Sequence, residues 1–360
     1  MRLIISLAAA LCATAFLTDI PYDDSQSGKS YASSHNMLAL YGEQQKPADK
    51  AAKDPLVIRR ELYDRLSTVT GVPWYWMAAI DQYERSMSKA RPKARPLLGE
   101  NIGVFIDQER WAGPLNPDLD DSTPASIQWF NGIGRDGDGN GSADRFSDID
   151  LLYSLVNRVA AYGTEENDLA IGLWEFYNNS RSVQRIQQFA RIYEKFGKLD
   201  LFQHAFPLPL GSNYSYRSTW GTGRSWGGRR THEGTDIFAN HGVPARSTSY
   251  GIVEIKGWNP YGGWRIGIRD LNNYYHYYAH LTGYEKNIEI GSIVEPGQVI
   301  GYVGSSGYGK PGTQGKFPPH LHYGVYSDRG LIEWSFDPYP MLKRWETEER
   351  KRLSRKVSKP

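Results

Sequence analysis

The chain has 360 residues, a formal net charge of +2 and a hydrophobic content of 40%. The near-neutral charge gives no reason to expect a nucleic-acid partner, and the hydrophobic content is low for a membrane protein and adequate for ordinary protein cores. The length predicts two or more domains. The only cysteine is Cys12, so the chain beyond it can form no disulfide, and any metal site there must use His, Asp or Glu.

Residues 1–15 have the pattern of a secretory signal peptide. Arg2 precedes an apolar run that ends with the small-x-small signal Ala-Thr-Ala at residues 13–15. The run is too short for a comfortable transmembrane span, and an uncleaved N-terminal anchor is the alternative. We expect cleavage after Ala15, a secreted protein without a stable membrane span, and a polar linker at residues 16–55.

Residues 56–200 have the apolar spacing of three and four residues that is typical of helices. The pattern is clear in PWYWMAAIDQYERSM, in DIDLLYSLVNRVAAYG and in SVQRIQQFARIYEKFG. The last two stretches end on Gly163 and Gly197, and glycine is a preferred residue just after a helix. This part of the chain is therefore predicted to be a mostly α domain.

Residues 201–345 differ in character, because short β-like runs alternate there with turns that contain glycine and proline. Examples of these runs are GIVEIKGW, WRIGIRD and HLHYGVYS. The pattern predicts a β-rich domain. The remaining residues, 346–360, are basic, and we expect a disordered, solvated tail rather than a segment that binds an anionic polymer.

Histidines gather in the β-rich part, where seven of the eight lie between residues 204 and 322. Three close pairs stand out: His232 and Asp236, His276 and His280, and His320 and His322. In a strand, His320 and His322 share one face while Leu321 points to the other. Catalytic zinc sites use three His or carboxylate ligands and keep one position open, and two ligands near in sequence with a third from a distant strand can form such a site.

The stretch at residues 206–330 resembles the lysostaphin/LytM-type zinc endopeptidases of peptidoglycan. The resemblance rests on RTHEGTDIFANHGVPARS, which is similar to the family's H-x-G-x-D-type opening, on YYAHL, on the hairpin IEIGSIVEPGQVIGYVGSSG and on the H-x-H strand in PPHLHYGVY. These stretches occur in the family's order. The resemblance implies a small antiparallel β-sheet domain with a groove over one zinc ion per chain.

The same resemblance implies roles for five positions, all of which are intact in this sequence. It makes His232, Asp236 and His322 the zinc ligands. It makes His280 and His320 the catalytic histidines, which would polarise the attacking water and stabilise the oxyanion as the amide becomes tetrahedral.

Other residues near these motifs have less defined roles. His276 is expected on the same strand face as His280 but outside the site, and His204 and His241 are also interpreted as non-catalytic. Glu233 is either a neighbour of the metal ligands or simply a surface residue. The residues before the first ligand either line the substrate groove, with arginine facing a stem-peptide carboxylate, or form a structural loop: Trp220, Trp226, Arg229 and Arg230.

Residues 55–197 resemble the lysozyme-like domain of lytic transglycosylases. GVPWYWMAAIDQYERS is similar to the helix that carries the catalytic glutamate, which places Glu84 at the position of the acid. One carboxylic acid can suffice to protonate the glycosidic oxygen in that reaction. The family's Gly-x-Met-Gln-type segment is missing, however, so Glu84 is either the glycan-site acid or an ordinary helix-surface carboxylate, and the domain either cleaves glycan or only binds it.

Between these predicted helices, DGDGNGSADRFSD resembles a calcium loop of the EF-hand kind. Its candidate ligands are Asp136, Asp138, Asn140 and Asp148. Ser147 stands where the EF-hand has a bidentate glutamate, which weakens the site without excluding it. The alternative is a turn rich in Gly and Asp, although related transglycosylase domains carry a similar loop.

The predicted fold class is α+β: a mostly α lysozyme/transglycosylase-like domain precedes a small antiparallel β-sheet LytM-type peptidase domain. The pairing resembles the sporulation-associated L-alanyl-D-glutamyl endopeptidases of endospore formers. It implies a zinc endopeptidase, associated with the cell wall, that cuts peptidoglycan stem peptides between L-Ala and D-Glu in wall or spore-cortex remodelling. We also expect a monomer. The alternatives are a non-catalytic wall-binding or activator protein and a bifunctional enzyme that also cleaves glycan with Glu84.

Overall fold

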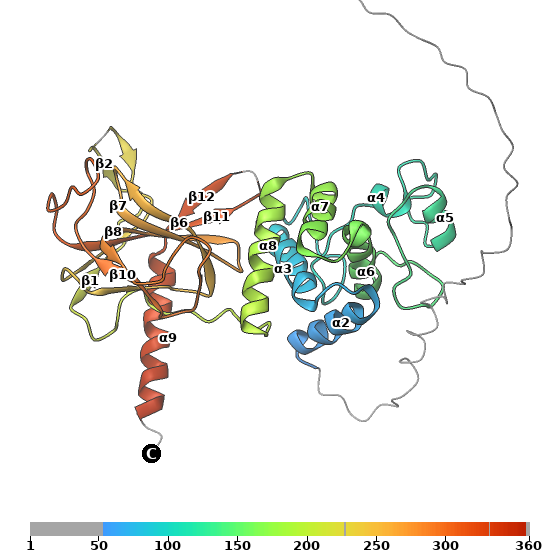
Figure 1. Ribbon diagram of the computed structural model, residues 1–360, viewed down its shortest axis with the longest axis horizontal. Coiled ribbons are helices and arrows are strands. Elements are labelled where there is room, and N and C mark those ends of the chain that lie inside the picture. Colours follow the sequence, from blue (N-terminus) through green and yellow to red (C-terminus); the bar gives the residue numbers. More distant parts are fainter. Residues whose placement is uncertain (1–52, 227, 331, 358–360) are drawn as a thin grey trace, which may run out of the picture.

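The computed structural model describes residues 53–226, 228–330 and 332–357. A helical region and a β-sheet region lie side by side, with helix α8 (Ser180–Phe196) at the edge of the helical region that faces the sheet (Figure 1). The predicted signal peptide and most of the predicted linker lie outside the described residues. Within those residues, no helix combines the length and the apolar character needed to cross a membrane.

The helical region follows the predicted apolar spacing. Besides α8, its elements are α2 (Pro55–Thr70), α3 (Trp74–Ala90), α4 (Gln108–Ala112), α5 (Pro124–Trp129), α6 (Asp148–Val159), the 3₁₀ turn η1 (Ala160–Tyr162) and α7 (Glu166–Tyr177). Gly163 ends η1 and Gly197 ends α8, both with positive φ, which confirms the two predicted glycine caps. The α3 residues Met77, Ile80 and Met87 are buried at the centre of this region.

The β region is built around an antiparallel sheet with the strand order β1-β4-β11-β8-β7-β6-β9. Its strands are β1 (Tyr214–Tyr216), β4 (Thr235–Ala239), β5 (Pro244–Arg246), β6 (Gly251–Asn259), β7 (Gly263–Asp270), β8 (Tyr274–Tyr284), β9 (Ile293–Val294), β10 (Val299–Val303), β11 (His320–Asp328) and β12 (Glu333–Phe336). Strand β12 pairs with β11, and β10 pairs with β5 and β8. The short strands β2 (Gly223–Arg224) and β3 (Arg230–Thr231) pair separately. The predicted antiparallel β-sheet domain is therefore confirmed.

The two regions share an apolar core and a buried group of charges. Ile252 of β6 and Leu271 belong to the hydrophobic cluster formed by the helices. Arg185 on α8 forms ion pairs with Glu254, Asp328 and Glu333, which all belong to the sheet region. Because removing one partner of a buried ion pair leaves an uncompensated charge, at a cost of about 3–5 kcal/mol, these contacts hold α8 firmly against the sheet.

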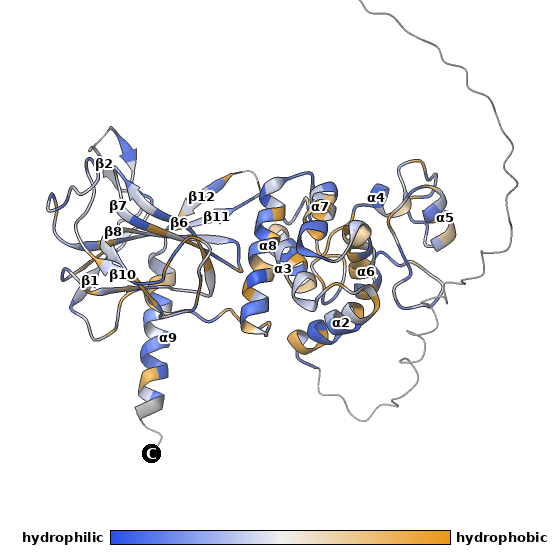
Figure 2. Cartoon of the chain, viewed as in Figure 1, coloured by the Kyte–Doolittle hydropathy of each residue, from blue (hydrophilic) through white to orange (hydrophobic). Residues whose placement is uncertain are grey.

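The prediction of a disordered tail at residues 346–360 is wrong for the described part of it. Helix α9 (Tyr339–Val357) continues through the expected domain limit at residue 345. Its Leu342 and Trp345 are fully buried in the core of the β region, and its Glu346 accepts hydrogen bonds of 2.6 Å from two tyrosine hydroxyls of β1. Figure 2 shows a largely hydrophilic helix with few apolar positions, so the basic composition concealed the residues that anchor it.

Candidate metal and active site

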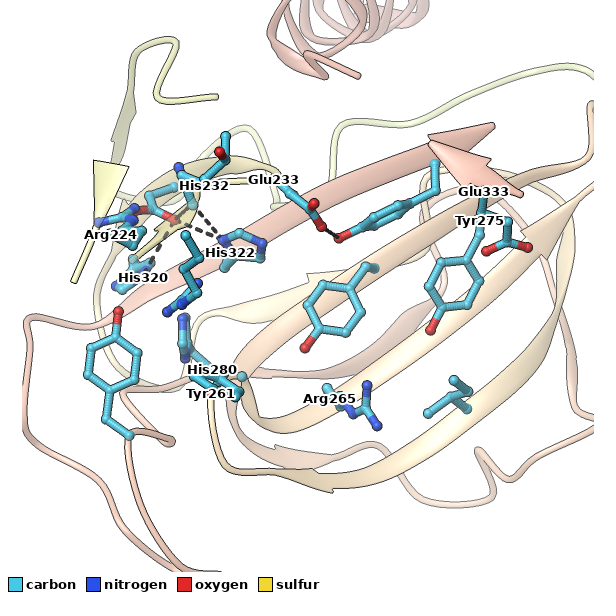
Figure 3. Close-up of a pocket in the computed structure, with 18 of the residues that line it drawn as sticks. Arg224, His232, Glu233, Tyr261, Arg265, Tyr275, His280, His320, His322 and Glu333 are labelled. Atoms are coloured by element: carbon cyan, nitrogen blue, oxygen red, sulfur yellow. Dashed lines mark hydrogen bonds and ion pairs between the residues drawn. The ribbon is translucent and has the colours of Figure 1, made fainter. Parts of the chain in front are cut away.

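Strand register brings the sequence motifs together. In the pairing of β11 with β4, His322 lies opposite Asp236, and on its other side His322 lies opposite Ala279 of β8. His232 comes immediately after β3 and joins them from the loop before β4 (Figure 3). Leu321 is fully buried in the core on the other face of β11, which confirms the predicted alternation.

Three of these side chains converge on one point. Nε2 of His232 lies 2.8 Å from Nδ1 of His322 and 3.0 Å from Oδ1 of Asp236, and Nδ1 of His322 lies 3.1 Å from the same Oδ1. Ligand atoms on a tetrahedral zinc ion at the usual bond lengths are separated by about 3.3 Å. The three atoms therefore have nearly the mutual spacing of three corners of a zinc tetrahedron.

The protonation of this group also suits a metal. Nδ1 of His232 lies 2.8 Å from the carbonyl oxygen of Thr219, which can only accept, so Nδ1 carries the proton and Nε2 offers a lone pair to the centre. An ionised carboxylate and lone pairs directed at one point form a donor set that fits a divalent cation.

Gly234 makes this close convergence possible. A Cβ at residue 234 would lie 2.7 Å from the His322 ring and 2.6 Å from the carbonyl oxygen of Tyr323. Any side chain there would displace the ligand histidine or the strand that carries it. The glycine in the HEGTD motif is therefore required by the approach of β11, not by a turn.

His280 reaches the same face of the sheet through an irregularity in β8. Its φ is +63°, a left-handed value that is uncommon for residues other than glycine, and the register of β8 shifts next to it in the pairings with β7 and β10. The prediction that His276 and His280 share a strand face is therefore wrong. His276 lies on the core side, fully buried between Asp270 and the Tyr323 hydroxyl, at 3.1 and 2.7 Å.

His280 and His320 form a second pair beside the metal-type group, with ring centroids 4.8 Å apart. Their Nδ1 atoms donate to the carbonyl oxygens of Ser306 and Pro318, at 2.8 and 2.9 Å, so each Nε2 keeps a lone pair. Burial lowers the pKa of both rings, and for His280 the neighbouring histidines lower it further. Nε2 of His320 points toward Oδ1 of Asp236, 3.7 Å away. Two neutral imidazoles that can accept a proton thus stand next to the three ligand-type atoms.

An open groove extends from this centre along the sheet to helix α8, with a cavity volume of about 970 Å³. Its floor carries aromatic and charged side chains from β7, β8 and β11, including Arg265, Tyr277 and Tyr326. Arg181 and Arg185 of α8 line the far end. The helical region therefore contributes to one wall of the same groove that contains the five site residues.

Only some of the residues before the first ligand lie at the groove. Arg230 lines the groove, whereas Arg229 and Trp220 are exposed outside the set of lining residues. Trp226 stacks on Tyr308, which lines the groove, with ring centroids 4.5 Å apart. Glu233 is turned from the histidines toward Tyr326, whose hydroxyl donates to it over 3.1 Å (Figure 3).

Among the described residues, His204 and His241 lie apart from the metal-type group. His204 stacks on Trp345 of α9, and burial lowers its pKa to about 4. His241 is exposed in the turn between β4 and β5. Neither lines the groove.

Sequence reasoning missed several residues that complete the site. Arg224 of β2 forms an ion pair with Oδ2 of Asp236, and Thr219 holds the tautomer of His232. Phe317 packs against both His280 and His320. Arg224 and Thr219 lie in a stretch rich in glycine and aromatic residues without periodicity, so no local signal marks them. Phe317 directly precedes the Pro-Pro-His stretch, and this position next to a site motif was the one sequence feature that could have indicated its role.

The acidic loop of the helical region gathers a different set from the one expected. The carboxylates of Asp136, Asp138 and Asp150 offer oxygens that all lie within 4.8 Å of one another. Burial raises the pKa of Asp150 to about 6. Asp148 instead accepts hydrogen bonds from the backbone N–H groups of Asn101 and Ile102, so its carboxylate is committed to another loop. The Asn140 side chain contacts Asp138.

Glu84 is not on the helix surface. It is fully buried, and both of its carboxylate oxygens accept hydrogen bonds from Arg95, at 2.7 and 2.8 Å, while the Tyr177 hydroxyl donates to one of them over 2.6 Å. Burial raises the pKa of Glu84, against the influence of Arg95 and Tyr177. A glycosidic oxygen has no access to a carboxylate that is covered in this way, so the surface interpretation is wrong and the geometry does not favour the acid interpretation either.

Comparisons with known proteins identify relatives of this chain. The model of "Peptidase family M23" matches residues 230–334. The L-Ala–D-Glu endopeptidase of Bacillus subtilis (strain 168) is 53% identical over 314 residues, which cover 87% of this chain and 96% of that protein. Lysostaphin of Staphylococcus simulans is 34% identical over 139 residues, or 38% of this chain and 23% of lysostaphin.

Among solved structures, a putative glycyl-glycine endopeptidase from Ruminococcus gnavus is 36% identical, with a TM-score of 0.37 and coverage of 51% of this chain and 74% of that one. The region matched by the family model contains all five residues that converge at the head of the groove. With the similarity to the Bacillus protein along almost the whole chain, this places the chain in peptidase family M23.

Proposed function

We propose that this chain is a zinc endopeptidase that hydrolyses peptidoglycan stem peptides between L-Ala and D-Glu. The observation that carries the proposal is the convergence of His232, Asp236 and His322 beside His280 and His320. The choice of bond is supported by the 53% identity to an enzyme named for it. We further propose that the protein is secreted, monomeric and associated with the cell wall, where it would act in wall or spore-cortex remodelling.

The chemistry can be divided between the metal and the protein. When bound to His232, Asp236 and His322, zinc acidifies water and polarises a carbonyl group. One ring of the His280–His320 pair accepts the proton released by the attacking water through its free Nε2. The imidazolium so formed stabilises the oxygen of the former carbonyl group by a hydrogen bond and then passes the same proton to the leaving amine. Burial lowers the pKa of both rings, which keeps them neutral, with Nε2 unprotonated, at neutral pH. The carbonyl groups of Ser306 and Pro318 fix the ring orientations.

Digestion of purified peptidoglycan tests the reaction. The zinc-loaded chain should release stem peptides that begin with D-Glu and leave L-Ala on muramic acid, as detected by mass spectrometry of the fragments. Release of peptides cut elsewhere would contradict the choice of bond. Bound zinc without any release would support instead a non-catalytic wall-binding or activator protein.

Paired histidine variants test the division of roles. His322→Ala should abolish stoichiometric zinc binding, because it removes one of three ligands, whereas His320→Ala should retain zinc and lower kcat by about 100-fold or more. Metal content by atomic spectroscopy and cleavage of a stem peptide measure the two effects. Equal loss of zinc in both variants would contradict this assignment.

Glu84 is proposed to be structural rather than the acid of a second, glycan-cleaving activity. Glu84→Gln should lower the free energy of unfolding by about 3 kcal/mol, because it leaves the Arg95 charge without its partner. Glu175 is a matched control, since it also contacts an arginine and a tyrosine but lies at the surface, and Glu175→Gln should have a smaller effect. Anhydro-muramic ends produced by the wild type and lost in Glu84→Gln would establish the bifunctional alternative instead.

We also propose that the acidic loop binds calcium through Asp136, Asp138 and Asp150, with Asn140 nearby. Calcium at 100-fold its Kd should then stabilise the protein by about 2.7 kcal/mol, seen as a higher Tm. Asp150→Asn should abolish this calcium-dependent rise. Asp148→Asn should lower the Tm at all calcium concentrations but keep the rise, because its carboxylate binds the backbone at residues 101–102. A rise that depends on Asp148 and not on Asp150 would contradict the observed arrangement.

A further inference from the structure

The groove is lined by more arginines than its own carboxylates neutralise. Six line it: Arg181, Arg185, Arg224, Arg230, Arg265 and Arg269. The first three and the last form ion pairs with protein carboxylates. Among the described residues, no carboxylate lies within ion-pair distance of Arg230 or Arg265, and the Nε atoms of both are buried without a hydrogen-bond partner. Four other arginines also have a buried Nε without a partner, so the feature that sets Arg230 and Arg265 apart from the other arginines of the groove is a charge without a neighbouring carboxylate.

These two arginines lie over two neighbouring tyrosines of the groove. The guanidinium carbon of Arg265 lies 5.9 Å from the ring centroid of Tyr277, and that of Arg230 lies 5.0 Å from the ring of Tyr261. Gly262, next to Tyr261, is so close to the Tyr277 hydroxyl that a Cβ there would lie 2.2 Å from it. Burial raises the pKa of Tyr277, and the positive charges of Arg265 and Arg230 oppose the rise. Arg265 thus contacts Tyr277 directly, and Arg230 lies over the adjoining Tyr261 in the same groove.

This cluster lies directly beside the metal-type group. The Tyr277 ring is 5.8 Å from that of the ligand histidine His322, in an edge-to-face contact. Arg265 projects from β7 into the same groove as His280 (Figure 3). The phenol of Tyr277 thus lies against a ligand histidine, and the two guanidinium groups line the same groove beside it.

We propose that Arg265, Arg230 and the Tyr277 hydroxyl form a subsite for a substrate carboxylate. The proposal rests on the proposed function. A glutamyl residue whose amino group belongs to the scissile bond has two carboxyl groups, and at most one of them continues the peptide. The other remains free within one residue of the cut. Arginine offers the planar fork of donors that matches a carboxylate, and desolvation in the groove strengthens the contact.

The test compares stem peptides that differ in one charge. The zinc-loaded full chain is given a peptide with a free glutamyl carboxylate, the same peptide with that group amidated, and a third in which only the C-terminal carboxylate is amidated. Wild type should show kcat/KM about 10- to 100-fold higher for the first than for the second, as expected for loss of one charge-assisted hydrogen bond. The third should behave as the first. If only amidation of the C-terminal carboxylate lowered kcat/KM, the subsite would bind that group, and the assignment to the glutamyl carboxylate would be wrong.

Variants connect this preference to the named arginine. Arg265→Gln should lose about 10- to 100-fold in kcat/KM on the free carboxylate and little on the amide, whereas Arg265→Lys should recover part of the loss because the charge remains. Arg217→Gln is a control with the same change in charge at an exposed position outside the groove lining, and it should leave the preference intact. Zinc content and Tm should be unchanged in all three.

Two results would overturn the subsite: equal loss on the acid and the amide in Arg265→Gln, which indicates a structural role, or no loss on either. Failure of the wild type to cut any of the peptides would refute the proposed function instead. In that case, calorimetric affinities of the same peptides for wild type and Arg265→Gln still decide the question. The subsite requires that wild type bind the acid more tightly than the amide and that the variant lose this difference.

Discussion

The register among β4, β11 and β8 is the constraint on which the whole site depends. It places Asp236 opposite His322 and brings β8 alongside, so that ligands from distant parts of the sequence meet without any disulfide or long loop. A shift of one residue in β11 would turn both of its histidines into the core and Leu321 into the groove. The buried side chains of Leu321, Tyr323 and Val325 oppose such a shift, so the hydrophobic core also fixes the geometry of the metal ligands.

Sequence patterns predicted the site where strand periodicity holds. The two-residue alternation of His320, Leu321 and His322 is regular and could be predicted directly. The roles of the five positions came from the resemblance to a known family, whose local motifs are complete in this chain, and they remain predictions. Periodicity failed at His280, because a left-handed residue and a register shift reverse the face of the strand within four residues. The partners Arg224, Tyr277 and Arg265 could not be predicted, since only tertiary contacts give them a role.

Contacts with distant segments also account for two predictions that were wrong elsewhere in the chain. Composition suggested a disordered end where α9 lies, but two buried side chains and a carboxylate shared by two tyrosines are enough to hold a basic helix on the sheet. Spacing in the acidic loop suggested Asp148 as a calcium ligand. Its carboxylate instead accepts hydrogen bonds from the backbone N–H groups of residues 101–102. In both cases a polar group was already engaged by a distant segment, which local patterns cannot reveal.

The ion pairs between α8 and the sheet affect how the protein unfolds. The helices and the strands share apolar contacts at Ile252 and Leu271, and Arg185 would be left buried and alone if they separated. Opening this junction would also dismantle the far wall of the groove. Heat should therefore unfold both regions in a single cooperative transition. A proteolytic fragment limited to the sheet region would expose the apolar and charged side chains that α8 covers, and it would not be an independent folding unit.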